Sequence, residues 1–276
     1  MKGLTAIPLS LALLGVAEPE GLRAQIEWAA KLHADRPGAP DEASDEAGRF
    51  RALQLNAAAP ECRPRLLGRS ARRDLAALLR RSELSCSGVD LFIPPDHLTD
   101  PAHSDRALSA LLDAIDFAAE MAELTRGGPV LSTLLPDAED AAAPVNSALS
   151  ALRERASSQG VRIADCRWPL AKRHEPADSP IGVGVDVAQV LLDGSILGDP
   201  AREVSRLGPR VVSIRVSDAS ASGRAEVGSR GGRLDVLALS VAAATGGYRG
   251  SAVVDVRGLR DAARGATAAL AAWRVM

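Results

Sequence analysis

The stretch Leu4-Thr-Ala-Ile-Pro-Leu-Ser-Leu-Ala-Leu13 decides between two folds for this chain. A continuous apolar run is typical of a strand that is buried on both faces of a parallel sheet. With Lys2 before it and Gly15-Val-Ala17 after it, the same run also resembles a secretory signal peptide. As a strand, the run completes a closed barrel. As a cleaved signal peptide, it leaves an open, doubly wound sheet.

The rest of the chain alternates between strand and helix patterns, which indicates a parallel sheet covered by helices. Seven further strands are predicted at 50–56, 84–93, 129–135, 161–166, 181–185, 211–216 and 251–256. Helices are predicted between them at 20–33, 70–81, 104–124, 140–158, 199–207, 234–244 and 259–273. Residues 4–13 make the eighth strand, and eight strands close a TIM barrel. We therefore expect one α/β domain over 1–276, a (β/α)8 TIM barrel with an exposed polar insertion at 35–48.

Composition excludes several classes of protein. Lys and Arg number 33 against 35 Asp and Glu, so the net charge of −2 provides no basic field for nucleic acid. No other segment has the roughly 20 apolar residues that a membrane span needs. The three cysteines form no CxxC pair, so neither a zinc knuckle nor a disulfide framework is indicated. We expect a cytoplasmic protein, or an exported one if residues 1–17 are a signal peptide; the sequence does not specify an oligomeric state.

Aspartates gather at the ends of the last predicted strands. In a TIM barrel the chemistry lies at the carboxyl ends of the strands, and here these ends carry Asp165, Asp186, Asp218 and Asp255. Carboxylates that converge on a barrel mouth are suited to a divalent cation. The alternative is that each Asp caps the helix that follows it.

Two other segments carry candidate residues. The loop Gly228-Ser-Arg230-Gly-Gly-Arg233 offers backbone N–H groups and two arginines to a phosphate, or it is a flexible connector. His97 follows the third predicted strand, where it is either a group that assists proton transfer or an ordinary loop histidine.

The order of several loose motifs resembles the xylose isomerase-like TIM barrels, the sugar phosphate isomerase/epimerase superfamily. The matching motifs are Gly184-Val-Asp186-Val-Ala-Gln189, Val211-Val-Ser-Ile-Arg215-Val-Ser-Asp218, Gly231-Gly-Arg-Leu-Asp235, Gly247-Tyr-Arg-Gly250 and Val253-Val-Asp255-Val256. Near the N-terminus, Glu27-Trp-Ala-Ala-Lys-Leu32 and Leu53-Gln-Leu-Asn56 are similar to the first helix and the second strand of that family. The resemblance spans the whole chain.

The resemblance implies an isomerase or epimerase that acts on a small sugar or sugar phosphate with a divalent metal such as Mn, Mg, Co or Zn. In the family a Glu, an Asp, a His and a Glu hold the metal, and carboxylates move a proton at the neighbouring carbon. Here these positions correspond to Asp165 or Cys166, Asp186, Arg215 and Asp255, and the His three residues after the Asp is Gln189. A metal, if bound, is therefore expected on Asp165, Asp186 and Asp255.

Arg215 alters this expectation, because a guanidinium carries a fixed positive charge and has no lone pair for a cation. The simplest interpretation is that Arg215 replaces the metal and pairs with Asp186 and Asp255. The alternative is that the alignment is shifted or that Arg215 points outward. We expect the metal to be absent.

Two functional hypotheses remain from the sequence. The first is a sugar isomerase or epimerase with a degraded metal site, in which Asp165, Asp255 and His97 are the catalytic candidates. The second is a non-catalytic barrel that binds a small polyol or anionic ligand. Ligand contacts are expected from Gln189, Arg215, Asp218 and Arg230. A nuclease similar to endonuclease IV is disfavoured, because that chemistry uses many His ligands and this chain has four His.

Overall fold

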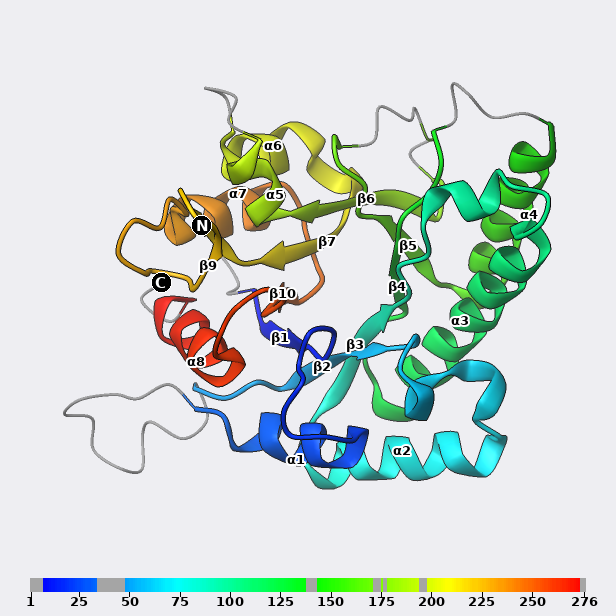
Figure 1. The fold of residues 1–276 in the computed structure, drawn as a ribbon, viewed down its shortest axis with the longest axis horizontal. Coiled ribbons are helices and arrows are strands. Elements are labelled where there is room, and N and C mark those ends of the chain that lie inside the picture. Colours follow the sequence, from blue (N-terminus) through cyan, green and yellow to red (C-terminus); the bar gives the residue numbers. More distant parts are fainter. Residues whose placement is uncertain are drawn as a thin grey trace.

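A computed structural model describes residues 7–33, 48–137, 143–170, 175, 178–193 and 198–273 of the chain. Eight parallel strands close into a barrel in the order β1-β2-β3-β4-β5-β6-β7-β10, with β10 paired to β1. In Figure 1 these strands lie at the centre and the helices surround them. The predicted TIM barrel is confirmed.

The barrel strands are short and mostly buried, as expected for strands that are covered on both faces. Their bounds are β1 Leu9–Ala12, β2 Ala52–Asn56, β3 Ser85–Asp90, β4 Val130–Thr133, β5 Arg162–Asp165, β6 Ile181–Asp186, β7 Val211–Val216 and β10 Ala252–Val254. A small antiparallel pair, β8 Asp218–Ser220 and β9 Gly223–Ala225, follows β7 directly. This pair was not predicted, because three-residue strands leave no periodic pattern.

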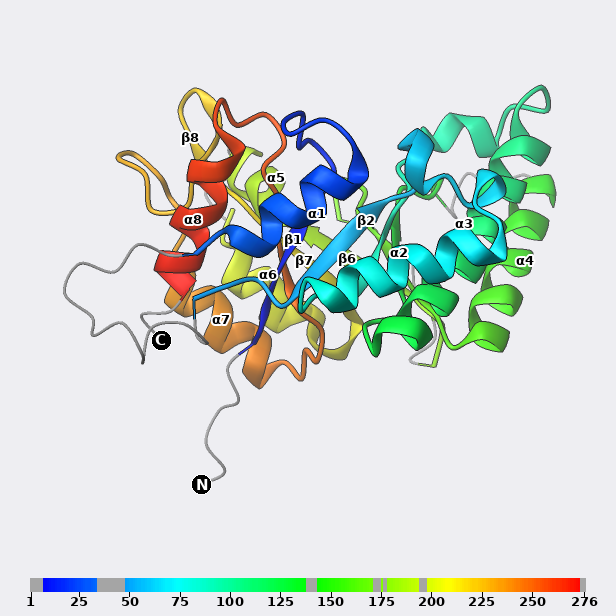
Figure 2. The same ribbon diagram turned by 90° about the horizontal axis from the view of Figure 1, so that it is seen from below.

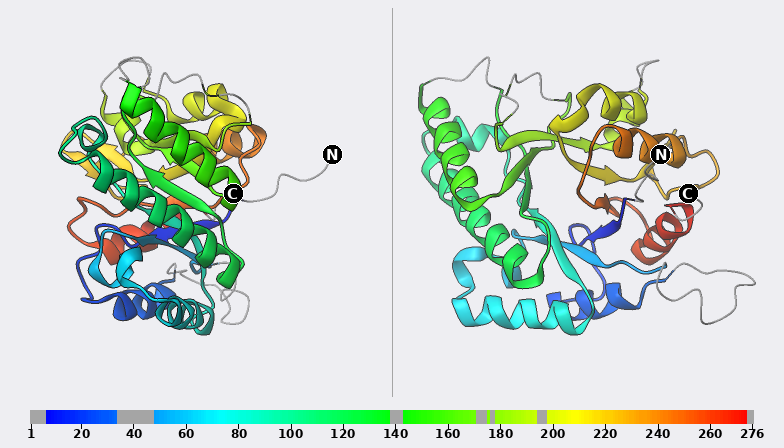
Figure 3. Two further views of the ribbon diagram at one scale, coloured as in Figure 1. Left: turned by 90° about the vertical axis from the view of Figure 1, so that its right-hand side faces the viewer. Right: turned by 180° about the vertical axis from the view of Figure 1, so that it is seen from behind.

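The helices form the outer layer of the barrel. Their bounds are α1 Leu22–Lys31, α2 Arg69–Arg81, α3 Ser104–Thr125, α4 Ala143–Gln159, α5 Val187–Leu192, α6 Pro200–Leu207, α7 Val236–Thr245 and α8 Ala262–Trp273. Seven of them match the predicted helices within three residues at each end. The six-residue α5 was expected as a turn; it directly follows Asp186, whose side chain caps it. Figure 2 shows α1 and α2 in front of β2, and Figure 3 shows α3 and α4 side by side on one flank.

The packing of the barrel follows from apolar spacing along the helices and from glycines in the strands. Helix α2 turns Leu75, Ala76 and Leu79 inward and exposes Arg73 and Arg80, an amphipathic arrangement. In β6, a Cβ atom on Gly184 would lie 2.3 Å from the Cys166 Sγ atom, so only glycine allows β5 and β6 to approach this closely. The Gly-Val-Gly sequence of β6 therefore serves sheet packing.

The N-terminal run is a barrel strand where the structure describes it. Residues Leu9–Ala12 pair in parallel with both β10 and β2, so the strand interpretation of this run is confirmed. Residues 1–6 and the predicted insertion at 35–48, apart from Gly48, lie outside the described residues. Among the described helices, none is long and apolar enough to cross a membrane.

Candidate functional site

The carboxyl ends of the parallel strands meet at one mouth of the barrel, and buried charged side chains gather there. Asp90 ends β3, Asp165 ends β5 and Asp186 ends β6, while Asp255 directly follows β10. Arg215 lies near the end of β7, where its Cα atom pairs with that of Asp186. All five side chains are buried, and Arg215 has no exposed surface.

Arg215 forms the centre of this group and connects two carboxylates. Its Nη1 and Nη2 atoms donate to the two oxygens of Asp90, at 2.7 and 3.3 Å, and its Nε donates to Asp255 Oδ2 at 3.0 Å. A planar guanidinium suits this fork-shaped pairing, which a lysine ammonium would not reproduce. Gln54 also holds Asp90 in place, because the Gln54 Nε2 atom donates to Asp90 Oδ1 at 2.7 Å.

Two further arginines cover this buried centre from the side of the mouth. Arg257 Nη2 lies 2.5 Å from Asp255 Oδ2 and 3.1 Å from Asp186 Oδ2. Arg224, on β9, also donates to Asp186 Oδ2, and its Nη1 lies 3.6 Å from Asp255 Oδ2. We call these residues the arginine–aspartate network: Arg215, Arg224, Arg257, Asp90, Asp186 and Asp255. Its three formal positive charges balance its three carboxylates.

The protonation of the network follows from burial and from these ion pairs. Burial alone would raise the pKa of Asp255, but the guanidiniums of Arg215 and Arg257 hold it well below its usual range. For Asp90 burial prevails, and its pKa lies above the ordinary value although Arg215 opposes the shift. Burial alone would lower the pKa of Arg215, but the carboxylates of Asp90 and Asp255 outweigh this effect and raise the pKa above its ordinary value. Arg215 therefore keeps its charge.

Phe92 is the apolar neighbour of the network. The guanidinium carbons of Arg215 and Arg257 lie 5.3 and 5.2 Å from the centre of its ring, within the range of cation–π contacts. An aromatic face at this point shields two charged groups from water without offering an acceptor of its own. It strengthens the ion pairs behind it, because Coulomb attraction grows as the surroundings lose water.

The acidic residues expected at a metal site are occupied by N–H donors. Asp186 Oδ1 accepts from the backbone N–H of Gln189 at 3.4 Å, and its Oδ2 faces Arg224 and Arg257. Asp165 Oδ1 accepts from the backbone N–H groups of Leu135 and Arg167, at 3.2 and 3.3 Å. Within the described ranges, no three His, Cys, Asp or Glu side chains are grouped so that they could hold a metal ion. The donor set around Arg215 does not fit a divalent cation.

The structure places the other predicted site residues in separate surroundings. Asp218 is buried, and its Oδ1 accepts from the N–H groups of Ala219, Arg233 and Leu234 at 2.7, 2.7 and 2.9 Å, so it anchors the loop 228–234. Arg230 lies exposed on that loop, and Gln189 is half-buried on α5. His97 lies after β3 against His103, with 4.8 Å between the ring centres.

The sequence analysis missed half of the network: Asp90, Arg224 and Arg257. The predicted strand at 84–93 continued past Asp90, whereas β3 ends at Asp90 and thereby places its carboxylate at the mouth. Arg224 lies on the hairpin that had no sequence signal. The expected pairing of Arg215 with Asp255 is observed, but the second partner of Arg215 is Asp90, and Asp186 pairs with Arg224 and Arg257 instead.

Comparison with solved structures identifies the fold. The chain is similar to a xylose isomerase-like TIM barrel protein from Mycobacterium smegmatis in complex with magnesium, with a TM-score of 0.67, 14% identity, and coverage of 100% of this chain and 99% of that chain. It is also similar to a D-psicose 3-epimerase with D-tagatose from Clostridium cellulolyticum H10, with a TM-score of 0.64, 13% identity and coverage of 96% and 90%.

A third similar structure is a probable 3-DHS dehydratase from Bacillus anthracis, with a TM-score of 0.64, 10% identity and coverage of 98% of each chain. No family model and no curated protein matches the sequence. At these identities the likeness concerns the fold, which supports several chemistries. The chain has the fold of the xylose isomerase-like TIM barrels, and its structural neighbours include sugar epimerases.

Proposed function

We propose that this chain binds a small polyol or anionic sugar derivative at the mouth of the barrel, without a catalytic metal ion. The observation that carries the proposal is Arg215, wholly buried between Asp90 and Asp255. The family resemblance implies a metal ligand at this position. A guanidinium offers no lone pair, and its fixed charge repels a cation beside it.

The basicity of Asp255 also argues against proton abstraction by the network. An efficient general base has a pKa near the working pH. The pKa of Asp255 is instead held below its usual range by Arg215 and Arg257. A carboxylate stabilised in this way accepts a proton poorly. Asp255 is thus better suited to holding a ligand than to removing a proton from it.

The mouth carries arginine N–H groups that make no hydrogen bond among the described residues, although Arg224 Nη1 lies 3.6 Å from Asp255 Oδ2 and Arg167 Nη2 lies 3.7 Å from Asp165 Oδ2. Within the described residues, Arg224 Nη1 and the Nε and Nη2 atoms of Arg167 are buried and make no hydrogen bond. Arg257 is 30% exposed at the same mouth. Buried donors usually find an acceptor, because an unmade hydrogen bond is costly. Polyols, sugar acids and sugar phosphates carry several closely spaced oxygen acceptors, and the D-psicose 3-epimerase neighbour was solved with D-tagatose.

The proposal is tested by measuring metal and ligand binding separately. Calorimetric titration with Mn²⁺, Mg²⁺, Co²⁺ and Zn²⁺ is expected to show no saturable micromolar site. A thermal-shift panel of ketohexoses, polyols, sugar acids and sugar phosphates is expected to raise the melting temperature with at least one compound. That increase should be lost in Arg257→Gln and kept in the matched variant Arg73→Gln, since Arg73 lies on the exposed side of α2.

Metal binding that disappears in Asp186→Ala would overturn the proposal. It would favour the alternative, an isomerase with an all-oxygen metal site on Asp165, Asp186 and Asp255. Turnover of a sugar in the presence of one of these metals would lead to the same conclusion. Absence of a shift with every compound on the panel would contradict the assignment of the ligand class.

A further inference from the structure

A second cavity lies beside the mouth, between the segment after β2, the segment after β3 and the first turns of α3. Its volume is about 350 Å³, within the range of small-molecule sites. Phe92 contributes to its wall and also contacts the guanidiniums of Arg215 and Arg257. The cavity and the arginine–aspartate network are therefore neighbours that share this aromatic ring.

The polar lining of this cavity is strongly basic. Five basic side chains and one carboxylate, that of Asp113, line it; the basic ones are Arg63, Arg65, His97, His103 and Arg106. The amino end of the 22-residue helix α3 lies at the same place, and no side chain caps it. The partial positive charge of a helix N-terminus adds to that of the side chains.

The arginines of the cavity differ from those of the network in their partners. Among the described residues, Arg63, Arg65 and Arg106 form no ion pair. Arg63 donates only to the backbone oxygen of Ala58, at 3.3 Å, and Arg106 Nη2 faces His103 Nδ1 at 3.4 Å. Three guanidiniums around one hollow without a carboxylate partner are suited to an anion from outside the chain.

The remaining wall is apolar. Leu91 and Ala107 are buried, Ile93 and Ala110 are half-buried, and the ring of Phe92 closes one side. Such a surface gains free energy when it covers a hydrocarbon or aromatic group, because apolar area is removed from water. The cavity thus combines an apolar wall with a cationic one.

We infer that this cavity binds a small organic anion, a phosphate ester or carboxylate that carries an apolar body. The anionic group lies toward Arg65, Arg106 and the start of α3, and the apolar body lies toward Phe92 and Ile93. The site is distinct from the polyol site proposed at the mouth, and either one can exist without the other.

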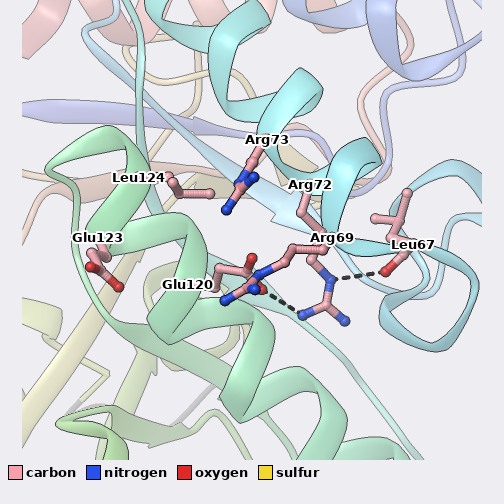
Figure 4. Close-up of a pocket in the computed structure, with 7 residues that line it drawn as sticks. All are labelled: Leu67, Arg69, Arg72, Arg73, Glu120, Glu123 and Leu124. Carbon is pink, nitrogen blue, oxygen red and sulfur yellow. Dashed lines mark hydrogen bonds and ion pairs between the residues drawn. The ribbon is translucent and has the colours of Figure 1, made fainter.

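A larger groove between α2 and α3 serves as the internal comparison. It measures about 480 Å³ and is lined by Leu67, Arg69, Arg72, Arg73, Glu120, Glu123 and Leu124. Figure 4 shows Arg72 directed at Glu120, and their Nη1 and Oε2 atoms lie 2.7 Å apart. Because carboxylates stand among its arginines, this groove offers less net positive charge to an anion.

The experiment uses three probes and isothermal titration of the full chain: phenyl phosphate, inorganic phosphate and phenol. Phenyl phosphate is expected to bind at one site with a Kd of ~1 mM or tighter, and the other two at least about tenfold more weakly. Arg65→Gln and Arg106→Gln should each weaken phenyl phosphate about tenfold, the loss expected for one charge-assisted hydrogen bond. Ala110→Phe fills the apolar part and should abolish the advantage of phenyl phosphate over inorganic phosphate.

The controls separate this cavity from its neighbours. Arg73→Gln in the α2–α3 groove should leave phenyl phosphate binding unchanged. Arg257→Gln at the mouth should weaken it less than Arg65→Gln does, because Arg257 contacts the cavity wall only through Phe92. The inference is overturned if phenol binds as tightly as phenyl phosphate, or if Arg65→Gln has no effect. Loss of phenyl phosphate binding in Arg257→Gln would place the anion at the mouth instead. Arg65 is exposed, and among the described residues its side chain forms no hydrogen bond or ion pair, so its variant reports on binding even if Arg106→Gln folds poorly.

Discussion

Replacing Arg215 with methionine removes the central charge of the network while keeping most of the side-chain volume. The variant loses three hydrogen bonds, two to Asp90 and one to Asp255. Asp255 retains Arg257 and Arg224 as partners, whereas among the described residues Asp90 retains only Gln54 as a side-chain hydrogen-bond donor. The main loss of stability therefore comes from Asp90, a carboxylate with no exposed surface that is left without a cationic hydrogen-bond partner.

The magnitude follows from the cost of leaving one buried charge unpaired. Breaking a buried ion pair costs about 3 to 5 kcal/mol, which is a large part of the stability of a typical domain. For a chain of this length such a loss lowers Tm by about 10 °C. Adding Asp90→Asn to Arg215→Met should recover part of the lost unfolding free energy, because the uncompensated charge is then removed.

The assay is urea unfolding followed by circular dichroism at pH 7 and at pH 5. The Asp90 pKa is already raised by burial and rises further once Arg215 is absent. A raised folded-state pKa stabilises the protonated native form at low pH, and this contribution is lost as the pH rises through the folded-state pKa. The difference between the wild type and Arg215→Met should therefore shrink at pH 5. A loss below about 1 kcal/mol at pH 7, or a loss that is the same at both pH values, would refute the reasoning.

Three further predictions rest on other parts of the structure. Gly232→Ala should destabilise the chain by ~1 to 3 kcal/mol, because the new Cβ would lie 2.2 Å from Asp218 Oδ2. A Cβ on Gly68 would have nothing within 4 Å, so Gly68→Ala should not destabilise the chain in this way, and thermal unfolding compares the two variants. Asp255→Asn should cost ~3 kcal/mol at pH 7 and less at pH 3. A lowered folded-state pKa stabilises the native state fully above the unfolded-state value, near pH 4, and progressively less as the pH falls toward the folded-state value; urea titrations at both pH values test the sign. Burial raises the pKa of the free thiols of Cys62, Cys86 and Cys166 to about 12. These thiols should therefore react with a disulfide reagent at pH 8 only after unfolding, and rapid labelling of the native chain would contradict this.

Periodicity in the sequence predicted the barrel because the signal is local and repeated. Each amphipathic helix such as α2 buries one face, and each buried strand such as β6 is apolar along its length, so both patterns are visible in a window of about ten residues. The number of these units then specifies closure into eight strands. The six-residue α5 and the hairpin β8–β9 were missed because neither is long enough to show a period.

The strand positions in the sequence also predicted that Arg215, Asp186 and Asp255 lie at one mouth of the barrel. The tertiary structure alone decided which carboxylate each arginine meets. Arg215 reaches Asp90, 125 residues earlier in the chain, because β3 ends at that residue and faces β7 across the barrel. Asp186 is left to Arg224 and Arg257. Pairing across a closed barrel depends on the register between strands that are far apart in the chain, and that register is not encoded in the local pattern of any one segment.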